Sequence, residues 1–225
     1  MTKKADRREL LLEKIHHGMK TIHKKADRLV FCREIVEEAE QAGLENLVLL
    51  AQGYQDWLNE EYSGAIEKFE LSLEIDGNSA LPWHGLGNVY SDQEEYQQAE
   101  QAYRKAIELD KSFSYPWNGL GIIYRIRKDY DLSKDAYLKA IKIDETYADV
   151  HRNLGLCLWV SGNLEEALRY FETALSLYKD QGDDYRASIA EENLNSVQGE
   201  IEGKKALQAA KAQKRKNAKT PSIAY

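Results

Sequence analysis

The chain has 225 residues, of which 31% are charged and 43% hydrophobic, and its formal net charge is −7. The longest apolar run, residues 47–51, is far shorter than the roughly 18 residues of a membrane-spanning helix. The mixed-charge N-terminus lacks the apolar core of a secretory signal. Cys32 and Cys157 show no paired spacing, so a disulfide framework is not implied. We therefore expect a cytoplasmic protein with a water-facing surface.

The charge is unevenly distributed. After Gly203 the chain has no acid and seven of its 31 Lys and Arg residues, which leaves 24 bases against 38 acids in residues 1–203. The body is therefore acidic and the tail basic.

Residues 1–45 are expected to form an N-terminal helical pair. Leu11, Ile15, Met19 and Ile22 recur at helical spacing and predict a helix over 5–24. A second helix is predicted over 27–42, with Asp27 as its N-cap and Gly43 at its end. The pair is expected to pack ahead of the region that follows, as a degenerate copy of its repeat.

That region is periodic. The segment that begins at residue 80 recurs 34 residues later, as the matched residues show: Trp83, Leu86, Gly87, Tyr90, Ala99, Tyr103 and Ala106, then Trp117, Leu120, Gly121, Tyr124, Ser133, Tyr137 and Ala140. A fixed period of this length indicates a stacked array of helical pairs.

These residues resemble the tetratricopeptide repeat (TPR) family, whose pattern is W-x2-L-G-x2-Y followed by A-x3-F, A and P. The resemblance covers four units, 46–79, 80–113, 114–147 and 148–181, which make one array over 46–181. The terminal Pro of the pattern is absent from all four. The resemblance implies an all-α fold, a right-handed α-α superhelix of stacked TPR helix pairs with an N-terminal helical extension and a C-terminal capping helix.

The repeated residue types have a packing explanation. Gly87, Gly121 and Gly155 fall inside predicted helices, where glycine costs about 1 kcal/mol relative to alanine. That cost is tolerable if the missing side chain lets a neighbouring helix approach. Trp83 and Trp117 are expected to fill the space between helices.

Two elements follow the array. Residues 182–203 are predicted to be a capping helix with a polar outer face, because such arrays need a capped end. Residues 204–225 are rich in Ala, Lys and Gln with almost no apolar face, and we expect a frayed or disordered tail.

No pattern points to catalysis. The sequence lacks the H-E-x-x-H, C-x-x-C and G-x-S-x-G patterns, so we predict no catalytic residue, no metal and no cofactor. His16 and His23 share a helix but have no clustered carboxylate or Cys pair to complete a metal site. The protein is expected not to be an enzyme.

The resemblance implies a binding groove on the concave face, which the first helix of each unit lines. Carried over by position, the candidate groove residues are Tyr54, Trp57, His84, Asn88, Tyr115, Asn118, Ile122, Arg125, Arg152, Leu156 and Trp159. Their character indicates a protein or peptide partner with apolar and some acidic groups. Some family members bind chaperone C-termini through a two-carboxylate clamp, but only Asn88 matches its five positions, so we predict a different ligand.

Several of these residues are also compatible with a purely structural role. Tyr54 and Trp57 are equally suited to packing on the N-terminal helices, Trp159 to packing on the capping helix, and Arg125 to pairing with a neighbouring acid. For the whole chain, the preferred function is an adaptor or scaffold that binds a peptide segment. The alternatives are a homo-oligomer formed through the N-terminal helices, and a tether through the basic tail to nucleic acid or an anionic membrane.

Overall fold

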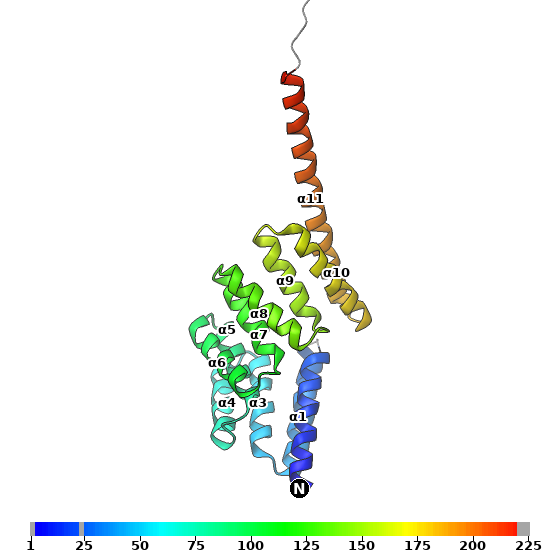
Figure 1. The fold of residues 1–225 in the computed structure, drawn as a ribbon. Helices are drawn as coiled ribbons and strands as arrows, with labels where there is room; N and C mark the ends of the chain where they lie inside the picture. The colour runs from blue at the N-terminus through cyan, green and yellow to red at the C-terminus, as the bar shows by residue number, and fades with distance from the viewer. Residues whose placement is uncertain (1–2, 23–24, 220–225) are drawn as a thin grey trace, which may run out of the picture.

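The computed structural model describes residues 3–22 and 25–219, and within these residues all regular structure is helical (Figure 1). Its helices, in chain order, are α1 (Lys3–Thr21), α2 (Lys25–Ala42), α3 (Glu45–Leu58), α4 (Tyr62–Ile75), α5 (Ala80–Asp92), α6 (Tyr96–Leu109), α7 (Ser114–Ile126), α8 (Tyr130–Ile143), α9 (Ala148–Val160), α10 (Leu164–Asp180) and α11 (Asp184–Lys219). The predicted all-α superhelix is confirmed. Residues 23 and 24, which include the end of the predicted first helix and His23, lie outside the described residues, as do residues 220–225 of the tail.

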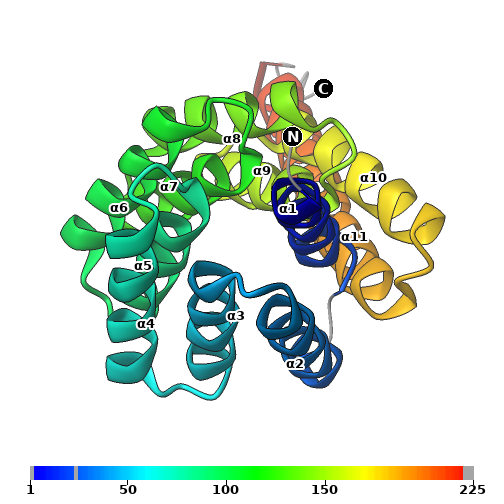
Figure 2. The ribbon, with the colours of Figure 1, turned by 90° about the horizontal axis from the view of Figure 1, so that it is seen from below.

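Each 34-residue span holds one helical pair, and the pairs stack into an arc (Figure 2). Within each pair the turn between the two helices contains one residue with a positive φ. These residues are Glu60, Glu94, Lys128 and Gly162, with φ of 67°, 62°, 67° and 87°, and they stand 34 residues apart. The backbone therefore repeats as regularly as the sequence does, even where the residue in the left-handed position is not glycine.

The mid-helix glycines admit aromatic rings from the second helix of a pair. A Cβ on Gly87 would lie 2.4 Å from the Tyr103 ring, and one on Gly121 would lie 2.4 Å from the Tyr137 ring. Phe171 lies against Gly155 in the same way. These distances are shorter than any van der Waals contact, so a side chain at the glycine would displace the ring. The close approach that the sequence predicted is thus a contact between a glycine backbone and an aromatic face.

The two repeated tryptophans are half-buried, so they are packed between helices but not sealed from water. Trp83 adjoins the N-terminal core and Trp117 adjoins the core of the later units. The ammonium group of Lys139 lies 4.5 Å from the centre of the Trp117 ring, a favourable cation–π geometry.

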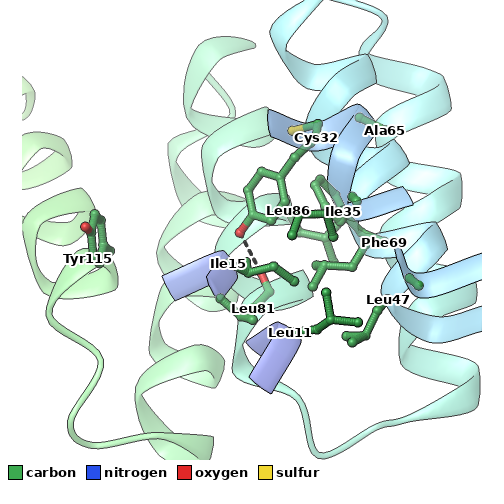
Figure 3. Packing of buried hydrophobic residues seen from close by; sticks show 14 of the residues in the cluster. Leu11, Ile15, Cys32, Ile35, Leu47, Ala65, Phe69, Leu81, Leu86 and Tyr115 are labelled. Atoms are coloured by element: carbon green, nitrogen blue, oxygen red, sulfur yellow. Dashed lines mark hydrogen bonds between the residues drawn. The ribbon is translucent and has the colours of Figure 1, made fainter. Parts of the chain in front are cut away.

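The N-terminal pair is not a copy of the repeat. α2 packs along α3, whereas α1 packs less extensively on α2 and lies on the inner side of the arc (Figure 2). Leu11 and Ile15 of α1 are buried in the same core as Leu47 and Leu81. Figure 3 shows these side chains as one group. The first helix therefore belongs to the interior of the superhelix.

The last helix is longer than the sequence analysis anticipated. We expected regular structure to end near Gly203, but α11 continues to Lys219 and projects beyond the body (Figure 1). Val197 and Ile201 are its last buried residues, and residues 202–215 are exposed. Ala, Lys, Gln and Arg are strong helix formers, which explains how this stretch stays helical without tertiary contacts.

Candidate protein-interaction groove

The first helices of the four units, α3, α5, α7 and α9, line the concave side, and α1 covers its N-terminal part. The His16 ring lies 5.0 Å from the Phe113 ring and 6.4 Å from the Tyr115 ring, centre to centre. Arg8 forms an ion pair with Asp76 at the end of the first unit. Apolar contacts and an ion pair thus fix α1 against the first three units.

Tyr54 and His84 lie in the core beneath α1 and α2. The Tyr54 hydroxyl is 3.0 Å from the Leu81 carbonyl oxygen and 3.0 Å from Nδ1 of His84. Because the carbonyl can only accept, the hydroxyl donates to Leu81 and accepts from the Nδ1 proton of His84. The Tyr54 hydroxyl and Nδ1 of His84 are thus both engaged inside the protein.

His84 was expected to face the groove, but it is only 5% exposed and lies among aromatic rings. Burial, followed by the positive charges of Arg28 and His16, lowers its pKa to about 3. The side chain is therefore neutral at physiological pH, and in this conformation a partner cannot reach it. The sequence did not reveal that α1 folds back over this position.

Trp57 joins the first two units. Its indole nitrogen donates to Asp92 Oδ2 at 2.7 Å, and its ring lies 6.2 Å from that of Tyr54. Burial raises the pKa of Asp92, although the bond from Trp57 opposes this shift. Trp57 is half-buried against the N-terminal core, so little of it remains for a partner.

The two groove asparagines are partly engaged in the chain's own hydrogen bonds. The Tyr103 hydroxyl donates to Asn88 Oδ1 at 2.9 Å. The Asn118 amide donates to Tyr147 at 3.4 Å and accepts from Asn153 at 3.0 Å. Asn118 therefore serves mainly to connect the third and fourth units, whereas the amide nitrogen of Asn88 has no partner among residues 3–22 and 25–219.

At the other end of the groove the concave surface is open. Ile126 and Val160, at equivalent positions of α7 and α9, are 43% and 57% exposed. Ile122 and Leu156 are half-buried one turn earlier. These four residues, 122, 126, 156 and 160, are called the apolar strip below.

Two candidate groove arginines lie on the same two helices as the apolar strip, Arg125 on α7 and Arg152 on α9. Arg125 and Arg152 form no ion pair with a carboxylate within the described part of the chain. Arg125 lies near the Tyr137 hydroxyl, where its charge partly offsets the burial that raises the pKa of Tyr137 to about 12. The expectation that Arg125 pairs with a neighbouring acid is therefore not met.

Trp159 contacts the capping helix. Its indole nitrogen donates to Glu200 Oε2 at 2.8 Å, and its ring meets the Phe171 ring edge-on at 6.2 Å. The hydrogen bond from Trp159, assisted by Lys204, lowers the pKa of Glu200. This contact agrees with the packing alternative that the sequence left open.

A cavity of about 200 Å³ lies where α1 meets the concave wall. Tyr115 is one of its lining residues, and its hydroxyl is buried with no hydrogen-bond partner in the described chain. Arg28 of α2 also lines the cavity. The sequence analysis missed Arg28 because it precedes the repeats, although its spacing from Cys32 and Ile35 places it on the buried face of α2.

Chemistry other than binding finds little support in the side chains. Among the residues that the structure describes, no group of three His, Cys, Asp or Glu side chains could hold a metal ion. Burial raises the pKa of the Cys32 thiol to about 11, which disfavours the nucleophilic thiolate. Within the described helices, none combines the length and the apolar character that crossing a bilayer requires.

Comparison with known proteins supports the fold. Tetratricopeptide repeat models match residues 80–113 and 114–180. No curated protein matches the chain. The crystal structure of MamA is similar over 81% of this chain and 98% of that chain, at 22% identity and a TM-score of 0.55.

Two further solved structures resemble the chain. A thermophilic TPR protein of Thermus thermophilus, TTC0263, is 14% identical over 83% of this chain and 98% of its own, with a TM-score of 0.61. The first TPR of Spaghetti (RPAP3), bound to the HSP90 peptide SRMEEVD, is 21% identical over 56% of this chain and 95% of its own, with a TM-score of 0.50. At these identities the likeness concerns the fold alone. With its 34-residue period, its paired helices and its repeat matches, the chain belongs to the tetratricopeptide repeat family, whose repeats are protein–protein interaction modules.

Proposed function

We propose that the protein is a non-catalytic adaptor that holds a segment of a protein partner on the open part of its concave surface. The segment would lie along α7 and α9, with apolar side chains on the apolar strip and one or two carboxylates near Arg125 and Arg152. The observation that carries the proposal is the pairing of exposed Ile126 and Val160 with two arginines that have no carboxylate partner in the described chain.

The apolar side chains of the strip are incompletely buried. Exposed apolar side chains that adjoin one another often mark an interaction surface. Arginine presents a planar fork of donors that matches a carboxylate, so an acidic residue in the partner would be held in a defined orientation. The RPAP3 repeat domain, which holds an acidic peptide, is a precedent for this use of the fold. Because only Asn88 matches the chaperone clamp, the peptide here would differ from that one.

Selection of binding peptides from a displayed random library tests the proposal. We expect enriched sequences to combine aliphatic or aromatic residues with Asp or Glu. Binding of the enriched peptides should weaken at least tenfold in Val160→Asp and in Arg152→Met. The matched control is Leu132→Asp on α8, because Leu132 is 52% exposed but belongs to the outer helix of its unit. Peptides that bind Val160→Asp and Arg152→Met as well as the unchanged protein would contradict the proposal.

A second candidate function rests on α11. Its projecting part after Gly203 carries seven bases and no acid, and residues 204–215 are exposed. Such a helix would attract nucleic acid or an anionic membrane through charge. If it does, binding to RNA or to anionic vesicles should fall steeply with salt and disappear when residues 204–225 are removed. Unchanged binding after this truncation would exclude it.

We do not propose self-assembly through the N-terminal helices. That alternative rested on Tyr54 and Trp57 being exposed. Tyr54 is 7% exposed and belongs to the N-terminal core, to which α1 and α2 of the same chain contribute, and Trp57 packs against that core. The apolar surface that a second copy was expected to cover is thus covered within one chain.

A further inference from the structure

The cavity between α1 and the concave wall is lined mainly by apolar side chains, but charged and polar side chains also line it. The apolar part of the lining includes Ile15, Phe31, Ile35 and Leu50. Its volume of about 200 Å³ is that of six or seven molecules of liquid water. At the packing density of protein interiors it would hold a ligand of about ten non-hydrogen atoms.

Among the described residues that line the cavity, Arg28 is the only Lys, Arg, Asp or Glu. Its Nε donates to the Ile22 carbonyl oxygen at 2.7 Å, which anchors the side chain at the α1–α2 connection. Its terminal guanidinium nitrogens have no ion pair or hydrogen bond with any residue in 3–22 or 25–219. A positive charge beside apolar surface with no acid to balance it favours an anion.

Two neutral groups add hydrogen-bonding capacity. The Tyr115 hydroxyl, on a side chain that is 9% exposed, is buried and has no partner within the described chain. A buried hydroxyl without a partner is unfavourable, and a ligand that accepts its hydrogen bond would remove that cost. Asn88, whose amide nitrogen is likewise unpartnered within the described ranges, lines the same cavity.

We propose that this cavity binds a carboxylate on a small apolar body, with Arg28 pairing to the carboxylate and Tyr115 donating a further hydrogen bond. Arginine can hold a carboxylate with two parallel hydrogen bonds, so a single guanidinium suffices to orient the ligand. The apolar body would lie against the Ile15, Ile35 and Leu50 side chains.

The ligand could be a free acid or the terminal residue of a peptide, since both present the same group. The inference stands apart from the proposed adaptor function, because that function uses α7 and α9 residues at the open end of the groove. A free acid would bind here even if no protein segment bound there.

Titration calorimetry with octanoate tests the proposal. Octanoate should bind the full chain, and 1-octanol, which has the same apolar body without the charge, should bind at least tenfold more weakly. Arg28→Met should weaken octanoate binding by at least tenfold, and Tyr115→Phe by about threefold to tenfold, in line with the loss of one neutral hydrogen bond. The matched control is Arg33→Met, which removes an exposed arginine from the same helix and should leave octanoate binding unchanged.

A parallel titration distinguishes the source. A short peptide that ends in Leu with a free carboxylate is compared with the same peptide carrying a C-terminal amide. If only the free carboxylate form binds, and Arg28→Met abolishes this binding, the site takes peptide termini. If octanoate binds and neither peptide does, the site takes free acids. Arg28→Lys keeps the charge and serves as a second variant if Arg28→Met unfolds; it should retain part of the affinity. The proposal is overturned if neither acid binds, if 1-octanol binds as well as octanoate, or if Arg28→Met and Arg33→Met behave alike.

Discussion

The ring of Tyr103 lies between two glycines of successive units, Gly87 and Gly119. A Cβ at Gly87 would lie 2.4 Å from this ring, and a Cβ at Gly119 would lie 2.5 Å from it. Phe69 lies in the same way between Gly53 and Gly85. One aromatic side chain on the second helix of a unit therefore spaces the first helix of its own unit from the first helix of the next. The period of the sequence is also a period of contacts between units.

Substituting Gly119 by alanine should destabilise the protein. The added methyl group would overlap the Tyr103 ring, which is itself confined by Gly87. Overpacking of a well-packed core costs about 1–3 kcal/mol, and this exceeds the gain of about 1 kcal/mol in helix propensity. Urea unfolding followed by circular dichroism measures the difference.

Gly199→Ala is the matched control, because a Cβ at Gly199 in α11 would meet no atom within 4 Å. It should stabilise the protein or leave it unchanged. Equal effects of the two substitutions would show that the contact between Gly119 and Tyr103 does not limit packing.

The left-handed turn positions allow a stabilising change. Lys128 has φ of 67° and is exposed, whereas the equivalent residue of the next unit is Gly162. A non-glycine residue costs about 1–2 kcal/mol in this region, and glycine loses about 0.5–1 kcal/mol more backbone entropy on folding. Lys128→Gly should therefore raise the free energy of unfolding by about 0.5–1 kcal/mol.

The reverse change at Gly162 should lower the free energy of unfolding by a similar amount, since a Cβ there would meet nothing within 4 Å and only the backbone conformation is affected. Thermal unfolding of Lys128→Gly and Gly162→Ala measures both. If both substitutions shift the unfolding temperature in the same direction, the left-handed backbone conformation does not determine their effect.

The sequence predicted the fold well because the repeat depends on local rules. A glycine and an aromatic residue at a fixed spacing specify the same contact in each unit, as Gly87 and Tyr103 do in theirs. The course of α1 is different, since its apolar stripe is compatible with packing on α2, on another chain or in the groove. Only the packed structure shows that Leu11 and Ile15 meet Leu47 and Leu81.

The candidate site was therefore predicted in part. Positions carried over from the family identified Arg152, which the structure leaves without a carboxylate partner in the described chain. They also included His84, which proves to be buried beneath α1. Arg28 lay outside any family position. Residue spacing within a unit fixes which helix face a side chain occupies, but not which other helix covers that face.

The buried His84 should make the protein sensitive to acid. Its pKa is about 3 in the folded state and close to 6.5 when exposed, so the unfolded chain binds one more proton between these values. The free energy of unfolding should thus fall as the pH decreases from about 6.5 towards 3, by up to about 1.4 kcal/mol per pH unit from this residue. Urea unfolding at several pH values measures the slope.

His84→Gln, which cannot titrate but keeps a hydrogen-bonding group near Tyr54, should reduce that slope. His151 is the comparison. Burial also lowers its pKa, but the hydrogen bond that its Nε2 donates to the Glu145 carbonyl oxygen at 2.9 Å opposes that shift. If His84→Gln leaves the slope unchanged, His84 is not the residue that causes acid sensitivity.

Removing the projecting part of α11 should not affect stability. A chain that ends at Gly203 keeps Val197 and Ile201, which are the last buried side chains of α11. A chain that ends at Asp183 loses Ala187, Ala190 and Val197 as well, and exposes the apolar side chains of α9 and α10 that they cover. Burial of a side chain such as Val197 contributes about 1.5–3 kcal/mol, and burial of each alanine methyl about 0.8 kcal/mol.

We therefore expect the first truncation to unfold at the same temperature as the full chain and the second to unfold well below it. Differential scanning calorimetry makes the comparison. A clear loss of stability in the chain that ends at Gly203 would mean that the projecting segment contacts the body.

Cys32 reports whether α1 stays in place. The thiol is buried beside the cavity, and burial raises its pKa to about 11, so alkylation by iodoacetamide at pH 8 should be slow in the unchanged protein. Ile15→Asp places a charge in the apolar core that holds α1, which is strongly unfavourable without a partner. This change should release α1 and raise the alkylation rate of Cys32 at least tenfold through local opening. Leu10→Asp is the matched control, because Leu10 is 66% exposed and its replacement should leave the rate unchanged.

Peptide mass spectrometry separates Cys32 from Cys157, which is buried on α9 and should stay unreactive in both variants. A parallel rise at both thiols would indicate global unfolding. Rapid alkylation of Cys32 in the unchanged protein would mean that α1 leaves the groove without help, and that the N-terminal part of the concave surface is then open to a partner. Slow alkylation that only Ile15→Asp relieves would instead confine partner binding to the open end formed by α7 and α9, where Ile126, Val160 and Arg152 lie.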